Sequence, residues 1–552
     1  MTRLLRSALF RSDRLCLVRR ALVATTLCVG LSACMVGPDY VRPSLDVGTM
    51  YKEAPGWKIA QPSADAPRGP WWEMFGDSTL NTLILELNIN NQNIVQAEAQ
   101  YRQAVAISSA SRAPLFPTVG ATASMDRSGV GGTSSSGRSV STGPINSYGA
   151  GVQANWEIDL WGSIRRGIEA GEASQLASAA NVAGVTLSSQ STLAQSYFQL
   201  RILDEQRRLL RATVQAYERS LQLTQNRYDA GVSGKGDVAL ARTQLENARA
   251  QMIDLQWQRA QLENIIAVLL GRAPSTFKIA DRTFDLEPPP IPVGLPSELL
   301  QRRPDIANAE RQAAAANAQI GVATAAWFPS LNITANGGYA TTQFTQWFTA
   351  PAQFWALGPQ LAQLIFDGGL RQAQIAQARA IFDAATAKYR QTVLQSLQEV
   401  ETAMTQVRVF EEEQRVIRIA VESAKEALRL ARNQYEQGLV DYLSVAVLET
   451  TALNTERNEI SMMGNRLASS VRLIVAIGGG WTTEDLNRLN INGQPLPLND
   501  QGASATTQDQ QALAQSVIVL PASGQSATAQ LSAVQSSSTQ QSTNSGNPMR
   551  AQ

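Results

Sequence analysis

The sequence predicts an α+β membrane protein in which a few β-strands of each chain join a shared β-barrel, and very long α-helices continue from that barrel. Three observations lead to this fold class. The chain repeats itself once, each half holds a long stretch of helix-forming residues without proline, and each half holds segments in which apolar and polar residues alternate.

The repeat is visible in short motifs that recur in the same order. Residues 160–165 (LWGSIR) match residues 366–371 (FDGGLR) at an offset of 206, and residues 227–231 (RYDAG) match residues 434–438 (QYEQG) at an offset of 207. We therefore predict two structural repeats, 78–286 and 299–480, each with the order helix, β-hairpin, long helix, helix. A proline-rich connector, 287–298, joins them.

The helices are predicted from the absence of helix breakers. Between Gly369 and Gly438 lie 68 residues without glycine or proline, and one helix of that length would measure about 100 Å. The first repeat has no proline from Ser163 to Asn226. The apolar stripe is narrow and rich in alanine, so we expect these helices to pack against similar neighbours as coiled coils do.

The β-hairpins are predicted at about 115–161 and 328–367. Apolar residues alternate with polar ones along 152–160 and 331–336, which is typical of outer-membrane barrels. Four strands are too few to close a barrel, and an open edge in lipid would leave backbone groups unpaired. The barrel should therefore be shared between chains; the alternative is a pair of hairpins packed on a helix in the periplasm.

The N-terminus is predicted to be a lipoprotein signal peptide, residues 1–33. Six arginines precede an apolar run that ends in Leu31-Ser32-Ala33-Cys34, which resembles a lipobox with Cys34 as the acylated residue. The alternative is an ordinary signal peptide. Cleavage changes the formal charge from +1 to −4 and removes the other two cysteines. Residues 34–77 would form an N-terminal periplasmic extension.

Composition excludes several functions. Lys+Arg (47) and Asp+Glu (46) are balanced, which argues against a nucleic-acid partner, and the lack of histidine removes the usual general bases and most zinc sites. We therefore expect that the chain is not an enzyme and that it binds no metal and no cofactor, apart from the covalent lipid on Cys34. The tail from Asn499 is rich in Gln, Ser, Ala and Thr and without periodicity.

Several motifs resemble one known family. Residues 70–77 (PWWEMFGD), 299–306 (LLQRRPDI) and 366–369 (FDGG) are similar to motifs of TolC/OprM-like outer-membrane factor lipoproteins, the NodT-like group of tripartite RND-type efflux systems. The resemblance covers about residues 34–490 and rests on the order of the motifs together with the repeat and the lipobox.

The resemblance implies a homotrimer with a 12-stranded outer-membrane barrel, four strands per chain, continuous with a long periplasmic helical barrel. Residues 481–552 would be a C-terminal equatorial segment and tail. The trimer would passively conduct drugs or other small molecules delivered by a periplasmic adaptor and an inner-membrane RND-type pump. Alternatives are the exit duct of a type I protein secretion system, a structural periplasmic lipoprotein without a pore, and a lipid-anchored cell-wall hydrolase.

The resemblance also places a gate at the periplasmic helix turns. Glycines there allow the chain to reverse, as in any helical hairpin. Glu449 is the first carboxylate after the pair Tyr442-Leu443, so the sequence departs here from the acidic constriction of the family, and the alternative is an apolar constriction at Leu443 or Val447. An ordinary exposed helix surface is the alternative for each gate candidate. The turn glycines are Gly231 and Gly438, and the gate candidates are Tyr228, Asp237, Tyr435, Asp441, Leu443 and Val447.

Overall fold

The computed structural model describes residues 35–45, 47–48, 50–53, 70–129, 131–133, 139–141, 144–283, 287–291 and 299–481. The chain divides into two units, Met1–Leu496 and Pro497–Gln552, and all described residues belong to the first. The predicted signal peptide, Cys34 and the tail beyond Trp481 lie outside the described residues.

The same order of elements occurs twice. The first half contains η1 (Trp71–Phe75), α2 (Ser78–Asn90), α3 (Gln92–Ser111), η2 (Ala113–Leu115), β1 (Thr118–Ser128), β2 (Gly131–Thr133), β3 (Ser139–Ser141), β4 (Ile145–Ile158), α4 (Ser163–Asp229), α5 (Lys235–Leu269) and η3 (Pro274–Thr276). The second half contains α6 (Leu299–Arg302), α7 (Pro304–Ala325), β5 (Ser330–Thr341), η5 (Phe344–Gln346), η6 (Ala350–Ala352), β6 (Gln353–Ala362), α8 (Leu370–Glu436) and α9 (Tyr442–Ala476).

The first repeat departs from the predicted single opening helix, because Asn91 divides it into α2 and α3. Asn91 has an extended backbone, and its side-chain oxygen accepts hydrogen bonds from the backbone N–H groups of Asn93 and Ile94. Its amide nitrogen donates to the carbonyl of Leu269 at 2.7 Å. The residue therefore caps α3 and ties the break to the end of α5.

The long helices have equal lengths. Helices α4 and α8 contain 67 residues each, and both begin directly after a glycine with positive φ, Gly162 (80°) and Gly369 (95°). Asp159 accepts hydrogen bonds from the first backbone N–H groups of α4, and Asp367 does so for α8. None of the described helices has a stretch both apolar and long enough to cross a membrane.

The four main strands form one antiparallel sheet in the order β1-β4-β5-β6. The two predicted hairpins are therefore joined side by side through β4 and β5, and β1 and β6 are the edges. The Ser/Gly-rich connection between β1 and β4 contains the short ladder of β2 and β3.

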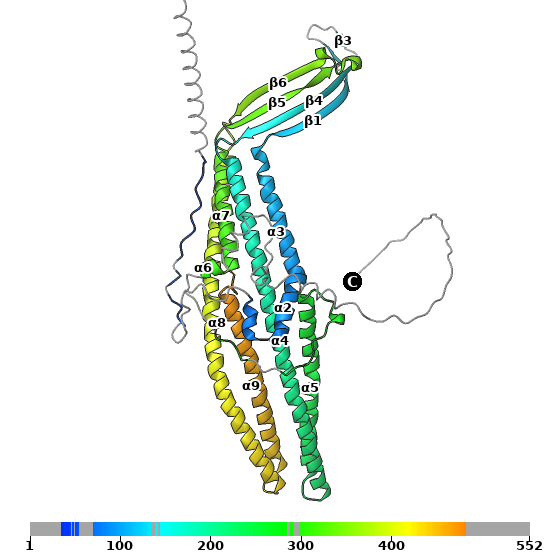
Figure 1. Cartoon of the computed structure of the whole chain (residues 1–552), viewed down its shortest axis with the longest axis vertical. Helices are drawn as coiled ribbons and strands as arrows, with labels where there is room; N and C mark the ends of the chain where they lie inside the picture. Colours follow the sequence, from blue (N-terminus) through cyan, green and yellow to red (C-terminus); the bar gives the residue numbers. More distant parts are fainter. Residues whose placement is uncertain are drawn as a thin grey trace, which may run out of the picture. The chain divides into compact units, whose positions relative to one another are not determined.

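The helices are layered so that the first repeat supplies one edge and the second repeat the other. Near the sheet, α3 packs on α4, α4 on α7, and α7 on α8; towards the turns, α5 packs on α4, α4 on α9, and α9 on α8. Figure 1 shows the sheet beyond one end of α3, α4, α7 and α8, and the α4–α5 and α8–α9 turns at the other. Every layer thus ends in a first-repeat element (β1, α3 or α5) and a second-repeat element (β6 or α8).

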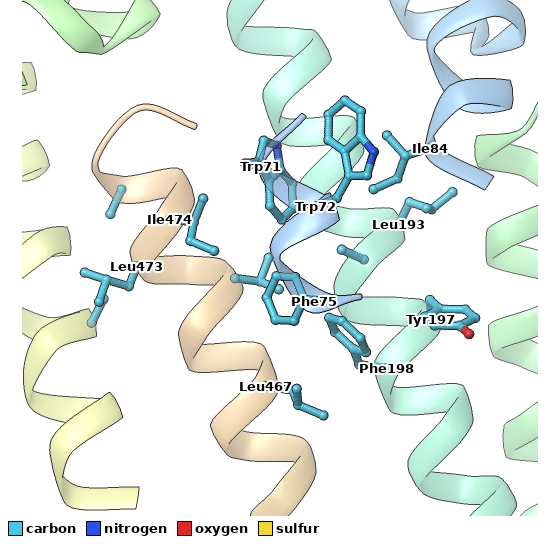
Figure 2. Packing of buried hydrophobic residues seen from close by; sticks show 14 of the residues in the cluster. Trp71, Trp72, Phe75, Ile84, Leu193, Tyr197, Phe198, Leu467, Leu473 and Ile474 are labelled. Carbon is cyan, nitrogen blue, oxygen red and sulfur yellow. The ribbon is translucent and has the colours of Figure 1, made fainter. Parts of the chain in front are cut away.

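The main core lies where the helices near the sheet meet the helices that lead to the turns. Figure 2 shows Trp71, Trp72 and Phe75 of η1 between α4 and α9, with Phe198 beside Phe75 (ring centroids 4.9 Å apart). Gly76, with φ of 66°, ends η1, and Asp77 then caps α2. The motif at residues 70–77 is therefore an apolar wedge followed by a helix cap.

Candidate functional site: a two-faced sheet and two helix turns

The strand register sorts the side chains of the sheet onto two faces. Val119, Ala154, Ala335 and Leu357 lie side by side across all four strands, because each is the Cα partner of the next. Successive side chains point to opposite faces of a strand, so the same register gives one face on which apolar residues predominate and one on which polar residues predominate, with exceptions such as Arg127 on the first and Phe354 on the second.

Apolar residues of the first face include Val119, Ala121, Met125, Val152, Ala154, Trp156, Ile158, Leu331, Ile333, Ala335, Trp355, Leu357 and Leu361. The second face includes Thr118, Thr122, Ser124, Asp126, Gln153, Asn155, Glu157, Asn332, Thr334, Asn336 and Gln360. Of the first set, Val119 (69%), Trp355 (79%) and Leu357 (68%) are largely exposed in the single chain. Such a face is suited to lipid, whereas the opposite face is suited to water.

Aromatic residues lie near both ends of the sheet. At the end away from the helices, Tyr148 contacts Phe344 (5.4 Å between centroids) and Trp347 (5.5 Å). At the helix end, Trp161 stacks on Phe328 (4.6 Å) and donates from its indole nitrogen to the carbonyl of Pro329 at 2.8 Å. Aromatic belts of this kind are typical of the two interfaces of a membrane.

Both predicted glycine turns have the same backbone geometry. Gly231 (φ 73°) ends α4, and the next residue donates its N–H to the carbonyl of Arg227 at 2.8 Å. Gly438 (φ 77°) ends α8, and Leu439 donates to the carbonyl of Gln434 at 2.9 Å. This pattern is the Schellman motif, in which a left-handed glycine satisfies the last helix carbonyls.

The two predicted gate aspartates cap the helices that follow the turns. Asp441 accepts from the backbone N–H (3.1 Å) and hydroxyl (2.7 Å) of Ser444, and these hydrogen bonds hold its pKa below the usual value. Asp237 accepts from the N–H of Gly234 at 3.3 Å. Each carboxylate thus has a local structural role, and a role in a gate remains a prediction.

The two predicted gate tyrosines have different surroundings. Tyr228 is 40% exposed, whereas Tyr435 is buried, with its hydroxyl 3.3 Å from that of Thr224. The guanidinium of Arg227 lies over the Tyr435 ring (4.6 Å) and donates to its carbonyl at 2.6 Å. Only Tyr435 therefore links the end of α4 to the end of α8.

Leu443 and Val447 lie one turn apart on α9 and share one exposed face, since residues four apart are neighbours on a helix. Their exposed fractions are 55% and 56%, and Val232 and Leu439, which follow the two turn glycines, are also exposed. The turns therefore present the apolar surface that the predicted apolar constriction requires. The part of Leu443 and Val447 in such a constriction stays a prediction.

Sequence reasoning missed a buried polar cluster above the turns. The Glu449 side chain is fully buried and accepts from Arg432 (2.8 Å), Ser220 (3.0 Å) and Tyr442 (3.4 Å). Burial, and to a smaller extent the negative charge of Glu449, raise the pKa of Tyr442. The same two causes raise the pKa of Tyr217 to about 12. The cluster joins α4 to α8 and α9.

A signal for this cluster existed in the sequence. Glu449 lies seven residues after Tyr442, which is two helical turns, so both side chains occupy one face of α9. Which face is buried was not predictable from that spacing. Among the described residues no group of acidic, histidine or cysteine side chains could hold a metal ion.

Comparisons with known proteins agree with this geometry. The family described as outer membrane efflux protein matches residues 83–272 and 295–479. The chain is 32% identical over 463 residues to the probable efflux pump outer membrane protein TtgC of Pseudomonas putida, covering 82% of this chain and 93% of that one. It is 31% identical over 421 residues to the pyoverdine export outer membrane protein OpmQ of Pseudomonas aeruginosa, covering 75% and 88%.

Solved structures show the same architecture. The outer-membrane channel OprN superposes with a TM-score of 0.76 at 30% identity, covering 81% of this chain and all of that one. CusC, whose structures concern transmembrane channel formation, gives a TM-score of 0.72 at 26% identity, covering 81% and 100%.

Proposed function

The chain belongs to the family of outer membrane efflux proteins, and from that premise we propose that three copies form the exit duct of a tripartite pump. The family and the location in the outer membrane confirm the function and localisation predicted from the sequence. The trimer, the 12-stranded barrel, the adaptor and the inner-membrane RND-type pump belong to the proposal.

The single observation that supports the duct best is the two-faced sheet with two free edges. Among the described residues, β1 and β6 each pair with one strand only. An open edge within lipid leaves backbone N–H and C=O groups without partners, at a cost of several kcal/mol each. Pairing β6 of one copy with β1 of the next removes every edge and turns the polar faces towards a common lumen. Three chains then give twelve strands, within the range of known barrels.

The helical layers support the same closure. The first-repeat edge carries exposed apolar residues on α5, namely Ile253 (61%) and Trp257 (58%). The second-repeat edge carries Val416 (54%) and Ile419 (56%) on α8. A neighbouring copy in the arrangement set by the strands would bring α8 towards α3 and α5 and cover these residues.

The turns support a closed resting state of the duct. Near the turns, two sets of polar contacts hold α4 to the second repeat: those of Tyr435 with Thr224 and Arg227, and the hydrogen bond from Ser220 to Glu449. Opening the duct at this end would separate α8 and α9 from α4 and break both links. We propose that adaptor binding at the turns supplies the free energy for that separation.

The test is conductance of the purified protein in a planar bilayer, together with drug susceptibility of a strain that lacks its own exit duct. We expect ion conductance, and restored resistance when the cognate pump and adaptor are expressed with the chain. A chain that reaches the outer membrane but gives no conductance, even with both links weakened by Tyr435→Phe, which removes the hydroxyl contact with Thr224, and by Glu449→Gln, would refute the duct.

A further inference from the structure

The first described residues lie against the junction between the sheet and helix α4. The N–H of Val36 donates to the carbonyl of Trp161 at 3.0 Å. A Cβ atom on Gly162 would lie 2.4 Å from Cγ of Met35 and 3.1 Å from its Cα, so only glycine leaves room for Met35 there. The chain thus arrives at this junction in direct backbone contact with it.

A buried arginine holds this segment in place. We call the described residues 35–45, 47–48 and 50–53 the strap. Arg166 of α4 is 1% exposed; its guanidinium pairs with Asp39 at 2.7 Å and donates to the carbonyls of Gly37 (3.3 Å) and Val36 (3.4 Å). A Cβ on Gly37, whose φ is 96°, would lie only 2.4 Å from Cα of Gly321, so the strap and α7 touch backbone to backbone.

The strap continues along the second repeat. Asn317 of α7 donates to the carbonyl of Pro38 at 2.9 Å, and Arg42 donates to the hydroxyl of Tyr389 on α8 at 3.1 Å. Farther on, the carboxylate of Glu401 accepts from the backbone N–H groups of residues 52 (2.6 Å) and 53 (3.1 Å). Contacts with α4, α7 and α8 therefore fix the start of the strap at one place on the surface of the helices.

That place adjoins an aromatic pair with an exposed apolar surface. The rings of Trp161 and Phe328 are stacked, with 24° between their planes, and Phe328 is 38% exposed. The indole nitrogen of Trp161 already has the carbonyl of Pro329 as its partner, so the pair offers ring surface without an unsatisfied polar group. Such aromatic surface at a membrane interface is compatible with acyl chains.

We propose that the Trp161–Phe328 pair is the docking site for the acyl chains on Cys34. Cys34 directly precedes Met35, which contacts Gly162, and consecutive Cα atoms are about 3.8 Å apart. The occupant is therefore a covalent part of this chain, and its lipid enters the membrane beside the inner aromatic belt. This inference depends on the predicted acylation of Cys34 and not on conduction.

The test uses a fatty acid that carries a photoactivatable diazirine and an alkyne, fed to cells that express the full chain. After irradiation, the alkyne-tagged peptides are isolated and the cross-linked residues are identified by mass spectrometry. We expect the N-terminal lipopeptide joined to residues around Trp161 and Phe328. Joining to mid-sheet residues around Trp355, adducts with phospholipid only, or an N-terminus without acyl chains would each overturn the proposal.

A matched pair of strap variants tests how the anchor is placed. Gly37→Ala and Gly48→Ala both put alanine at a positive φ, but a Cβ on Gly48 meets only a carbonyl oxygen at 3.9 Å. We expect Gly37→Ala to lower the cross-linked fraction at Trp161 and Phe328 at least fivefold, with acylation unchanged, and Gly48→Ala to leave it unchanged. Equal yields in both variants would overturn the placement by the strap. Conductance of the same samples reports on the duct separately.

Discussion

Substitution of adjacent residues on β4 separates the two faces of the sheet. Val152 lies on the apolar face in the middle of its strand, in register with Ala121 and Gly337, and Gln153 lies beside it on the polar face. An arginine facing lipid near the midplane of the bilayer costs about 2–4 kcal/mol. Three copies per barrel bring the expected cost of Val152→Arg to about 6–12 kcal/mol, whereas Gln153→Arg faces water and avoids that cost.

The assay is the amount of heat-resistant oligomer in outer-membrane fractions, measured by electrophoresis without boiling and corrected for total chain. We expect Val152→Arg to remove most of this oligomer and Gln153→Arg to retain it at a level near that of the unmodified chain. The two variants have the same charge and nearly the same position, so charge alone does not distinguish them. Equal loss in both variants, or greater loss for Gln153→Arg, would refute the assignment of the faces.

Three further predictions concern the helix turns. Glu449→Gln weakens a charge-assisted contact worth about 1.5 kcal/mol, so we expect roughly tenfold more frequent channel opening in planar bilayers; an unchanged open probability would exclude the link. The hydrogen-bonded carboxylate of Asp441 has a lowered pKa, so its stabilisation of α9 is present above its unfolded-state pKa and lost as pH falls through the folded value. The protection of the amides at the start of α9, which is the ratio of the intrinsic to the observed exchange rate, should therefore fall in acid and not between pH 6 and 8, and Asp441→Asn should abolish that acid response. Gly231→Ala should lower the free energy of unfolding by about 1–2 kcal/mol because the φ of this residue is 73°. Gly236→Ala, within α5, should raise the free energy of unfolding by about 0.5–1 kcal/mol. A change in the same direction for both variants, measured by thermal unfolding, would contradict this reasoning.

The gate candidates show where sequence reasoning reached its limit. Gly231 and Gly438 could be assigned to turns because the conformation of a turn depends on residues close in the chain. Asp237 and Asp441 were predicted as gate residues, and the structure shows that both also cap helices through neighbours three residues away. The buried state of Glu449 depends on Ser220, which is 229 residues away in the sequence, so no local pattern predicted it.

The strap is a second feature that no sequence pattern indicated. Its contacts join Asp39 to Arg166 and Arg42 to Tyr389, across 127 and 347 residues. The segment has no periodicity, and its glycines were not distinguishable from those of ordinary loops. Only the tertiary contacts show why glycine is required: a Cβ on Gly37 would lie 2.4 Å from Cα of Gly321, and a Cβ on Gly321 would lie 2.7 Å from Cγ of Arg166.

The sequence by itself determined the repeat, the lengths of the long helices, the alternation of the strands and the glycine turns. Each of these follows from periodicity or from backbone preferences, which act over a few residues. Tertiary structure alone decided that β4 pairs with β5, that Asn91 divides the opening helix, and which side chains are buried between α4 and α9. Those outcomes depend on the packing of segments far apart in the chain, where one turn of a helix or one step of strand register changes every partner.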